Sequence, residues 1–290
     1  MNLNKAVLFT APALIWGSTW FAIKFQLGDV PPAWSVAYRF YLASTLLFIY
    51  CGVRGISLKF DLQKHLRMAM QGCLLFGINY WLAYLAELEL TSALMSVAFG
   101  TIIFMNMLFG KLFLGNGIQG KVLFGAIMGI FGTFLIFFQD LKDTTWESLP
   151  MISIVFAFGS VGVASLGNIT SAANQKFDIP VISSNAFGML YGALLMSAVA
   201  LTTGTLPTFD FSTAYLSSLV YLSLFGSIIA FTSYLTLVGQ IGPTKASYVL
   251  VVIPAVSLVI STLYEGFIFS WYAIGGVILI LMGNVIVLRK

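Results

Sequence analysis

Residues 271–288 read WYAIGGVILILMGNVIVL, an apolar run of 18 residues without a charged side chain. A helix needs about 20 mostly apolar residues to cross the hydrocarbon core of a bilayer, so this run predicts a transmembrane helix. Similar runs, separated by connectors that are polar or contain Gly and Pro, fill most of the chain. We predict ten spans, at residues 6–23, 34–53, 68–86, 93–110, 122–138, 149–169, 181–200, 215–238, 246–264 and 271–288.

The composition indicates the same class of protein. Of the 290 residues, 59% are apolar and 8% are charged, whereas a soluble globular domain carries about 25% charged residues. The apolar runs are continuous, which favours helices over a barrel, because barrel strands alternate apolar and polar residues over about 10 positions. The sequence therefore predicts an all-α integral membrane protein in which no connector is long enough to form a soluble domain.

The charged residues predict the orientation of the spans, because cytoplasmic connectors of membrane proteins collect Lys and Arg. With the N-terminus inside, 11 of the 14 Lys and Arg residues fall on the cytoplasmic side. Only Lys24 and Lys142 fall outside, and Arg39 lies within the second span. Eight of the 10 acidic residues fall outside. We therefore expect both termini to be cytoplasmic, and one missed span would spoil this pattern.

The two halves of the chain resemble each other. The matches keep the same order and include the turns 29–31 (DVP) and 178–180 (DIP), and the glycine pairs Gly125/Gly132 and Gly276/Gly283. Five spans in each half force the halves into opposite orientations, as in many secondary transporters with a substrate site near the midplane. The prediction is a first repeat at residues 1–144 and an inverted second repeat at 145–290, in one transmembrane bundle. The alternative is convergence, because Asp-x-Pro is common before helices.

Several motifs together resemble the drug/metabolite transporter (DMT) superfamily, of the EamA type. They are WGSTWFAIK at 16–24, Pro31-Pro32, Arg39-Phe40, Pro254, Glu265, Trp271, Gly275-Gly276 and Gly283. The resemblance covers the whole chain and is strongest from Gly242 to Gly283. It implies ten helices in two inverted five-helix repeats, a place in the cell membrane (the inner membrane of a bacterium), and export of amino acids, other metabolites or toxic compounds.

The first half departs from this family pattern in the fourth span. The family usually has a proline and a terminal glutamate there as well. This chain has Thr101 where the proline is expected and Lys111 near the place of the glutamate. We therefore assign no glutamate role in the first half on the basis of the resemblance.

Lys24, Arg39 and Glu265 are candidates for a gating network at the outer ends of the spans. Arg39 lies about 8 Å inside the second span at 1.5 Å per residue, and a charge at that depth normally faces the bundle interior and has a partner. It binds a substrate carboxylate or closes an outer gate, or else it forms a permanent ion pair with Glu265 or Glu87 or binds backbone carbonyls. The alternative for Lys24 and Glu265 is that their side chains extend to the lipid headgroups at the membrane surface.

Six residues are candidates for a central substrate cavity. Tyr80 and Tyr84 share one face of the third span with Phe76 and Glu87, at helical spacing. Tyrosine hydroxyls in mid-membrane need hydrogen-bond partners, and their rings stack on apolar substrates or attract cations. The alternative is an interfacial position, which Tyr and Trp favour. The resemblance, through the helices that line the family's cavity, adds Trp16, Ser18, Asn168 and Tyr248.

Pro254 removes a backbone hydrogen bond in the middle of the ninth span and predicts a kink there. Kinked helices serve as gates, although Pro also occurs in static membrane helices. Cys51 and Cys73 lie within apolar runs and indicate neither a disulfide framework nor a metal site.

The sequence contains no Walker loop, zinc cluster or nucleophile motif, so we expect no ATP-driven step in this chain, no enzymatic activity and no cofactor. The predicted function is a secondary transporter that exports amino acids or similar small metabolites by alternating access at a central cavity. A channel or facilitated-diffusion pore is one alternative, and export of toxic or drug-like compounds is another.

The expected partners are a small-molecule substrate and the lipid bilayer, not nucleic acid. No obligatory protein partner is expected, since ten helices in one chain can enclose a pathway. No Asp or Glu lies deep in a predicted span, so the source of energy is open: the protein is a facilitator, or Glu265 takes up a proton.

Overall fold

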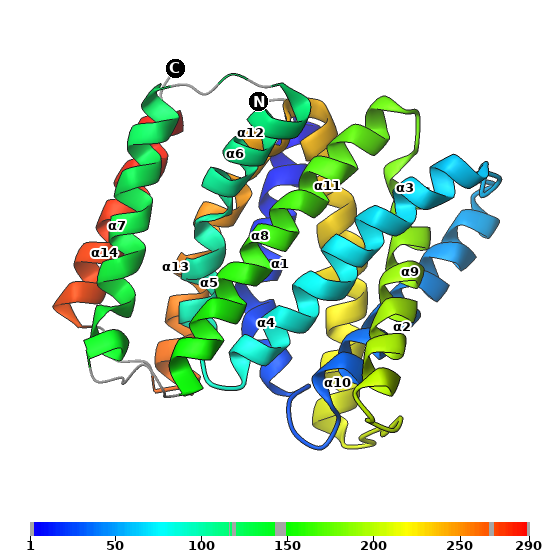
Figure 1. Cartoon of the computed structure of the whole chain (residues 1–290), viewed down its shortest axis with the longest axis horizontal. Helices are drawn as coiled ribbons and strands as arrows, with labels where there is room; N and C mark the ends of the chain where they lie inside the picture. Colours follow the sequence, from blue (N-terminus) through cyan, green and yellow to red (C-terminus); the bar gives the residue numbers. More distant parts are fainter. Residues whose placement is uncertain (1–2, 116, 118–119, 143–148, 267–269, 289–290) are drawn as a thin grey trace.

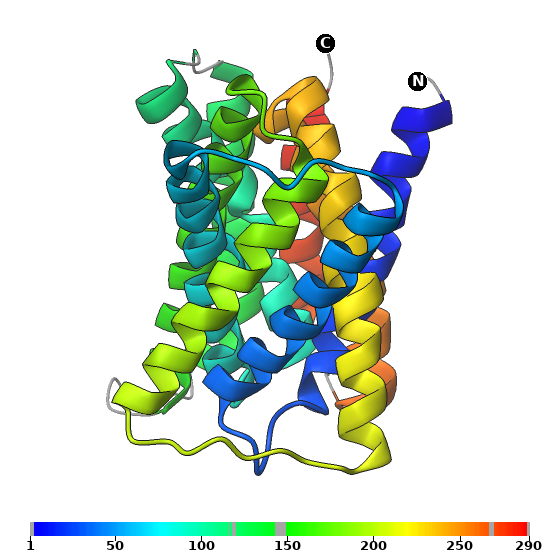
Figure 2. The same cartoon turned by 90° about the vertical axis from the view of Figure 1, so that its right-hand side faces the viewer.

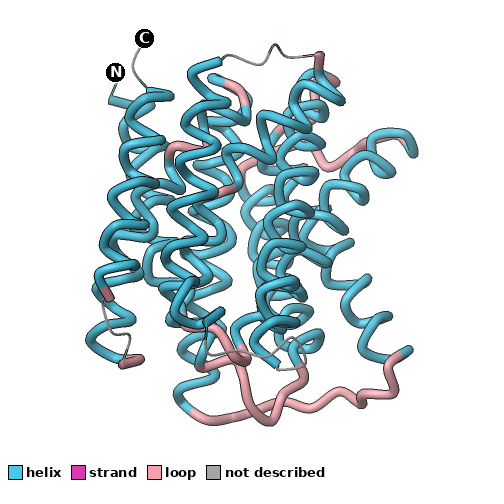
Figure 3. The backbone as a smooth tube through the Cα atoms, turned by 60° about the vertical axis from the view of Figure 1, so that its left-hand side comes forward, coloured by secondary structure: helices cyan, strands magenta, loops and turns pink. Residues whose placement is uncertain are grey.

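The computed structural model describes residues 3–115, 117, 120–142, 149–266 and 270–288. Within these residues the chain is helical and contains no strand. The helices lie side by side in one bundle (Figure 1), and the connections gather at its two ends (Figure 3). The predicted all-α class is therefore confirmed for the part of the chain that the structure describes.

The first half of the chain forms the helices α1 (Leu3–Lys24) and α2 (Pro32–Val53), the composite helices α3 (Leu62–Gly72)–η1 (Cys73–Ile78)–α4 (Asn79–Glu87) and α5 (Ser92–Gly100)–α6 (Ile102–Leu114), and α7 (Gly120–Lys142). The second half forms α8 (Leu149–Lys176), α9 (Val181–Thr202), the composite helices α10 (Thr213–Tyr221)–η2 (Leu222–Ile229)–α11 (Ala230–Ile241) and α12 (Pro243–Ala246)–α13 (Val249–Tyr264), and α14 (Trp271–Leu288).

Local signals set several helix ends. The side chain of Asp61 accepts a hydrogen bond from the backbone N–H of Lys64 (2.8 Å) and begins α3, and Ser212 begins α10 in the same way (3.2 Å to Tyr215). Such side chains satisfy backbone donors that have no partner within the helix. Gly115 ends α6 in the left-handed region, with φ at 71°, which glycine adopts at little cost.

Six helical segments within the described residues are long and apolar enough to cross a membrane. They are Lys5–Lys24, Pro32–Val53, Ser92–Leu114, Met151–Lys176, Val181–Thr202 and Thr213–Ile241. Shorter apolar helices occur at Leu123–Ile136 and Trp271–Gly283, and α13 has 16 residues. The chain is thus an integral, multi-pass membrane protein, and the count of ten spans stays a prediction.

Four helices of the bundle are interrupted, three near their middle and one near its start. The π-helical segments η1 and η2 lie within the third and eighth helical regions, Thr101 separates α5 from α6, and Ser247 and Tyr248 separate α12 from α13. Helix α13 continues past Pro254, so the interruption lies six residues earlier than this proline, and the predicted kink at Pro254 stays a prediction.

Glycines allow α7 and α14 to approach closely. Helix α7 packs against α14, and a Cβ on Gly132 would lie 2.6 Å from the carbonyl oxygen of Gly276. Further along the pair, a Cβ on Gly283 would lie 2.7 Å from the carbonyl oxygen of Gly125. The glycines that match between the halves of the sequence therefore face each other in the structure.

Helix α1 begins and α14 ends at the same end of the bundle (Figure 1). Helices α2 and α9 pack side by side, on the side of the bundle opposite to α7 and α14 (Figure 1). The boundary predicted at residues 144 and 145, and the charged residues Asp143, Glu147, Arg289 and Lys290, lie outside the described residues. The division into two repeats is therefore not tested by the fold alone.

We predict that Gly72→Ala destabilises the protein, because a Cβ at Gly72 would overlap the carbonyl group of Gly188 where α3 crosses α9. Overpacking of this kind costs about 1–3 kcal/mol, and thermal or denaturant unfolding of the purified protein measures it. Gly52→Ala is the matched control, since open space surrounds Gly52 and Ala stabilises helices over Gly by up to about 1 kcal/mol. Equal stability of both variants would contradict the prediction.

Candidate functional site

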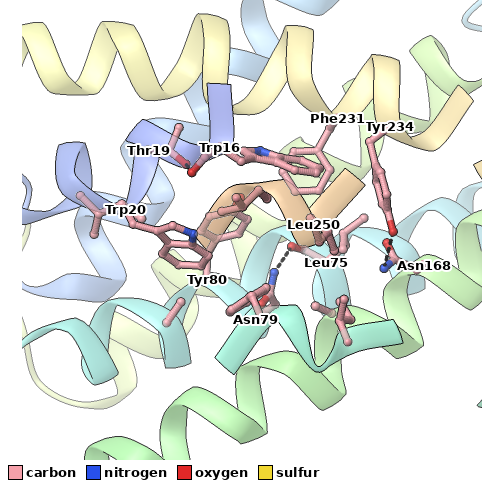
Figure 4. Close-up of a pocket in the computed structure, with 16 residues that line it drawn as sticks. Trp16, Thr19, Trp20, Leu75, Asn79, Tyr80, Asn168, Phe231, Tyr234 and Leu250 are labelled. Atoms are coloured by element: carbon pink, nitrogen blue, oxygen red, sulfur yellow. Dashed lines mark hydrogen bonds between the residues drawn. The ribbon is translucent and has the colours of Figure 1, made fainter. Parts of the chain in front are cut away.

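A cavity of about 40 Å³ lies in the middle of the bundle, room for roughly three water molecules. Its walls come from both halves of the chain: α1, the η1–α4 region and α5–α6 on one side, and α8, α11 and α13 on the other. Figure 4 shows the labelled side chains that point into it. The cavity therefore lies between the two halves of the chain.

Six of the 16 residues that line the cavity are aromatic. The Trp16 ring meets Phe231 edge-on, with centroids 4.9 Å apart, and the Trp16 indole N–H donates to the carbonyl oxygen of Gly226 (3.0 Å). Trp20 packs against Phe99 at 4.7 Å, and its buried N–H has no hydrogen-bond partner within the described residues. The result is a rigid apolar lining that presents one unused donor.

Two buried asparagines add polar groups to this lining. Asn79 donates to the carbonyl oxygen of Leu75 (3.0 Å) and accepts from Ser160 (2.8 Å), so both ends of its side chain are satisfied. Asn168 donates to the Tyr234 hydroxyl (3.3 Å), as Figure 4 shows. Its carbonyl oxygen has no partner in the described part of the chain, and it remains an acceptor for a ligand.

The guanidinium of Arg39 lies behind the aromatic wall. It sits 4.4 Å from the centroid of the Tyr80 ring and 5.3 Å from that of Phe40, within the range of a cation–π interaction. Its Nε donates to the Ser227 hydroxyl (2.9 Å). The side chain is fully buried, and its two terminal nitrogens have no hydrogen-bond partner among the described residues. Tyr80 thus separates a buried cation from the cavity.

The predicted network of Lys24, Arg39 and Glu265 is spread over separate contacts. The Lys24 ammonium donates to the carbonyl oxygens of Glu87 (2.6 Å) and Leu90 (2.5 Å). The Glu265 carboxylate accepts from the backbone N–H of Ser92 (3.2 and 3.3 Å) and from its hydroxyl (2.9 Å). Both groups therefore hold the connection between α4 and α5, and Arg39 is held by Ser227.

Three of the six predicted cavity residues line the cavity, and three do not. Trp16, Tyr80 and Asn168 belong to the lining. The Ser18 hydroxyl instead lies 2.7 Å from that of Tyr221. Tyr84 is fully buried beside Arg39, with a hydroxyl that has no partner in the described residues. Tyr248 lies at the break before α13.

Sequence reasoning missed several lining residues, namely Trp20, Asn79, Phe99, Phe231 and Tyr234. Trp20, Phe99 and Phe231 are apolar residues in helices that are apolar on every side, so no periodic pattern distinguishes a cavity face from a lipid face. Asn79 and Tyr234 do carry a signal, because polar side chains within apolar spans normally face the interior.

The model of the EamA-like transporter family matches residues 4–138 and 151–289. The chain is 28% identical to the "uncharacterized inner membrane transporter YedA" of Escherichia coli K12, over 93% of this chain and 88% of the relative. It is 25% identical to the "uncharacterized transporter YoaV" of Bacillus subtilis 168, over 84% and 83%.

Solved structures share this fold, and one of them is a crystal structure. It aligns with a TM-score of 0.74 at 16% sequence identity and covers 98% of this chain and 96% of its own. At this identity the likeness concerns the fold alone. It extends over nearly the whole helical bundle, which includes the elements around the cavity.

We predict that Ser227→Ala destabilises the protein by about 1–3 kcal/mol, because it removes the hydroxyl that accepts from the buried Arg39 guanidinium. Unfolding of the purified protein measures the loss. Ser217→Ala is the control: the Ser217 hydroxyl bonds only a carbonyl of its own helix at the surface, so a change within about 0.5 kcal/mol is expected. The loss should shrink in an Arg39→Met background, and an unchanged loss there would contradict the assigned contact.

Proposed function

Because the chain belongs to the EamA-like transporter family, we propose that it is a secondary transporter that exports amino acids or similar small metabolites. Transport proceeds by alternating access at the central cavity. The observation that carries this proposal is the cavity itself, which both halves of the chain line with aromatic rings and a free polar acceptor.

The size of the cavity favours a carrier over an open pore. Small-molecule sites measure about 300–1,000 Å³, whereas this cavity has about 40 Å³. A substrate therefore enters only when helices separate. A channel would normally show a continuous path with a filter or a charge ring. Saturable flux with countertransport distinguishes the two classes.

The chemistry around the cavity fits a zwitterion with an apolar part. The terminal nitrogens of Arg39 are free to bind a carboxylate in a bidentate manner once Tyr80 moves aside. The Asn168 carbonyl oxygen accepts from an ammonium group, and the face of Trp16 attracts a cation. The remaining lining packs against an apolar side chain. The same apolar lining accommodates a drug-like compound, which the substrate panel below tests.

We further propose ten spans in two inverted five-helix repeats. Three observations support the division: the family model matches twice along the chain, at residues 4–138 and 151–289; α2 packs against α9 and α7 against α14; and the π-helical segments η1 and η2 lie in the third and eighth helical regions, which correspond in the two halves. Lys24, Arg39 and Glu265 act in this scheme as an outer gate, because they fix the α4–α5 connection and α2.

The proposed location is the inner membrane, as the name of the Escherichia coli relative states for that protein, with both termini in the cytoplasm. The prevalence of Lys and Arg in the connectors on that side supports this orientation. The α2–α3 and α9–α10 connections, at opposite ends of the bundle (Figure 2), provide the test.

We predict that, in a variant without Cys51 and Cys73, a membrane-impermeant maleimide labels Thr208→Cys on intact cells but labels Lys59→Cys only after permeabilisation. Both positions are exposed, so the membrane and not burial decides their reactivity. Labelling is read by a mass shift on a gel. The reverse pattern would overturn the orientation, and labelling of both on intact cells would overturn the ten-span count.

We predict that Arg39→Met and Tyr80→Ala lower saturable efflux from proteoliposomes preloaded with a panel of labelled amino acids, metabolites and cationic dyes. For Arg39→Met the loss is about 10- to 100-fold at low substrate, since a hydrogen bond to a charged group contributes about 1.5–3 kcal/mol and 1.4 kcal/mol is tenfold. Arg54→Met and Tyr50→Ala are matched controls at exposed positions and should retain wild-type flux.

Efflux of dyes without efflux of amino acids would replace the proposed substrate by drug-like compounds. Unsaturable flux would favour the channel. Wild-type flux in Arg39→Met, at wild-type protein level, would remove Arg39 from the transport route.

A further inference from the structure

Glu87, the last residue of α4, is a buried carboxyl group without a hydrogen-bond partner. Its side chain is fully buried, and neither carboxyl oxygen has a partner among the described residues. Glu265, by contrast, accepts three hydrogen bonds from Ser92 and is only half-buried. An ionised carboxylate is costly to bury without such bonds, so a bound proton stabilises Glu87.

The charged and titratable groups near Glu87 lie on several neighbouring elements. They are Lys24 at the end of α1, Arg39 on α2, Tyr84 on α4 itself, and Glu265 after α13. Helix α5 has no ionisable residue, and the only one on α8 is Lys176 at its far end. Lys24 directs its ammonium to backbone carbonyls and not to the carboxyl group.

These surroundings leave the two protonation states of Glu87 in competition. The positive charges of Lys24 and Arg39 favour the carboxylate, while burial and the negative charge of Glu265 favour the neutral acid. Admission of water removes the burial effect. A separation of α4 from its neighbours therefore changes whether Glu87 holds a proton.

One face of α4 connects this group with the central cavity. Tyr80 lines the cavity (Figure 4), and Tyr84 follows one turn later with a buried hydroxyl that has no partner in the described residues. Glu87 lies seven residues beyond Tyr80, about 10 Å along the helix. In an open state, water that reaches Tyr80 is therefore separated from the Glu87 carboxyl group by one polar group, the Tyr84 hydroxyl.

We propose that Glu87 is the proton-binding site of the transport cycle, and that proton entry through this carboxyl group drives substrate export. The carboxyl group gives its proton to water and takes one from water at alternate sides of the membrane. The described conformation has a dry Glu87 and a cavity too small for a substrate. It is the proton-carrying, substrate-free form by which an exporter returns. The coupling to export rests on the proposed function, but the protonation of Glu87 does not.

The first test needs no substrate. Infrared spectra of the purified protein in lipid are recorded at neutral pH for wild type, Glu87→Gln, Glu265→Gln and Glu89→Gln. Gln resembles the neutral acid, so Glu87→Gln should unfold at the wild-type temperature. We expect a protonated-carboxyl band in wild type that is absent in Glu87→Gln and present in the other two. A band that survives in Glu87→Gln, or no band in wild type, would overturn the assignment.

The second test uses proteoliposomes with the panel compound that gives the largest saturable flux, and an imposed pH gradient. Wild type and the exposed Glu89→Gln variant should accumulate the compound against its gradient. Glu87→Gln should lose at least about tenfold of this accumulation while it retains exchange of labelled for unlabelled compound, since each 1.4 kcal/mol of lost driving force is tenfold. Wild-type flux that ignores the pH gradient would overturn the coupling, even where the infrared band is present.

The two tests separate the failure of the site from the failure of the function. Absence of flux for every compound of the panel, together with a band that Glu87→Gln removes, would reject the proposed substrate class and leave the proton site in place. Saturable flux with no such band would reject the proton site and leave the transporter in place.

Discussion

The arrangement of the site depends on how the protein holds the guanidinium of Arg39 inside the bundle. Arg cannot lose its proton, so the charge must be stabilised by the protein, and here one hydroxyl of η2 and the faces of Tyr80 and Phe40 do so. This single charge connects α2, α4 and η2. Because Tyr80 covers the cation on one side and the cavity on the other, any movement that exposes Arg39 also changes the cavity wall. In the proposed transport cycle, substrate binding and gating therefore share one side chain.

The helical interruptions supply the flexibility that this sharing requires. A continuous α-helix resists bending, whereas π-helical segments and breaks concentrate deformation at a few residues. In this bundle they lie in η1, η2, at Thr101 and at the α12–α13 junction, close to the cavity in the third, fourth, eighth and ninth helical regions. The tightly packed pairs α2–α9 and α7–α14 have no such breaks. The architecture thus combines rigid flanks with a deformable centre.

The all-helical membrane class was predictable, because continuous apolar runs reflect a single dominant force, the removal of apolar side chains from water. The site was predictable only in part. A charge within a span must face the interior, which identified Arg39, and the spacing on α4 identified Tyr80. The lining by Phe99 and Phe231 was not predictable, since lipid and a dry cavity select the same side chains. Tyr84 and Ser18 show the converse: a polar side chain finds a partner or a buried charge without reaching the cavity.

The unpaired polar atoms around the cavity distinguish this region from an ordinary packed core. Buried polar groups in proteins are almost always hydrogen-bonded, and in a bilayer no water replaces a missing partner. Here the Arg39 terminal nitrogens, the Tyr84 hydroxyl, the Glu87 carboxyl group and the Asn168 oxygen are unpaired within the described residues, and all lie in or beside the route from the cavity to the α4–α5 connection. Such groups raise the free energy of the closed form. They lower the cost of a hydrated, open form in which water, substrate or proton satisfies them, and this balance is what alternating access requires.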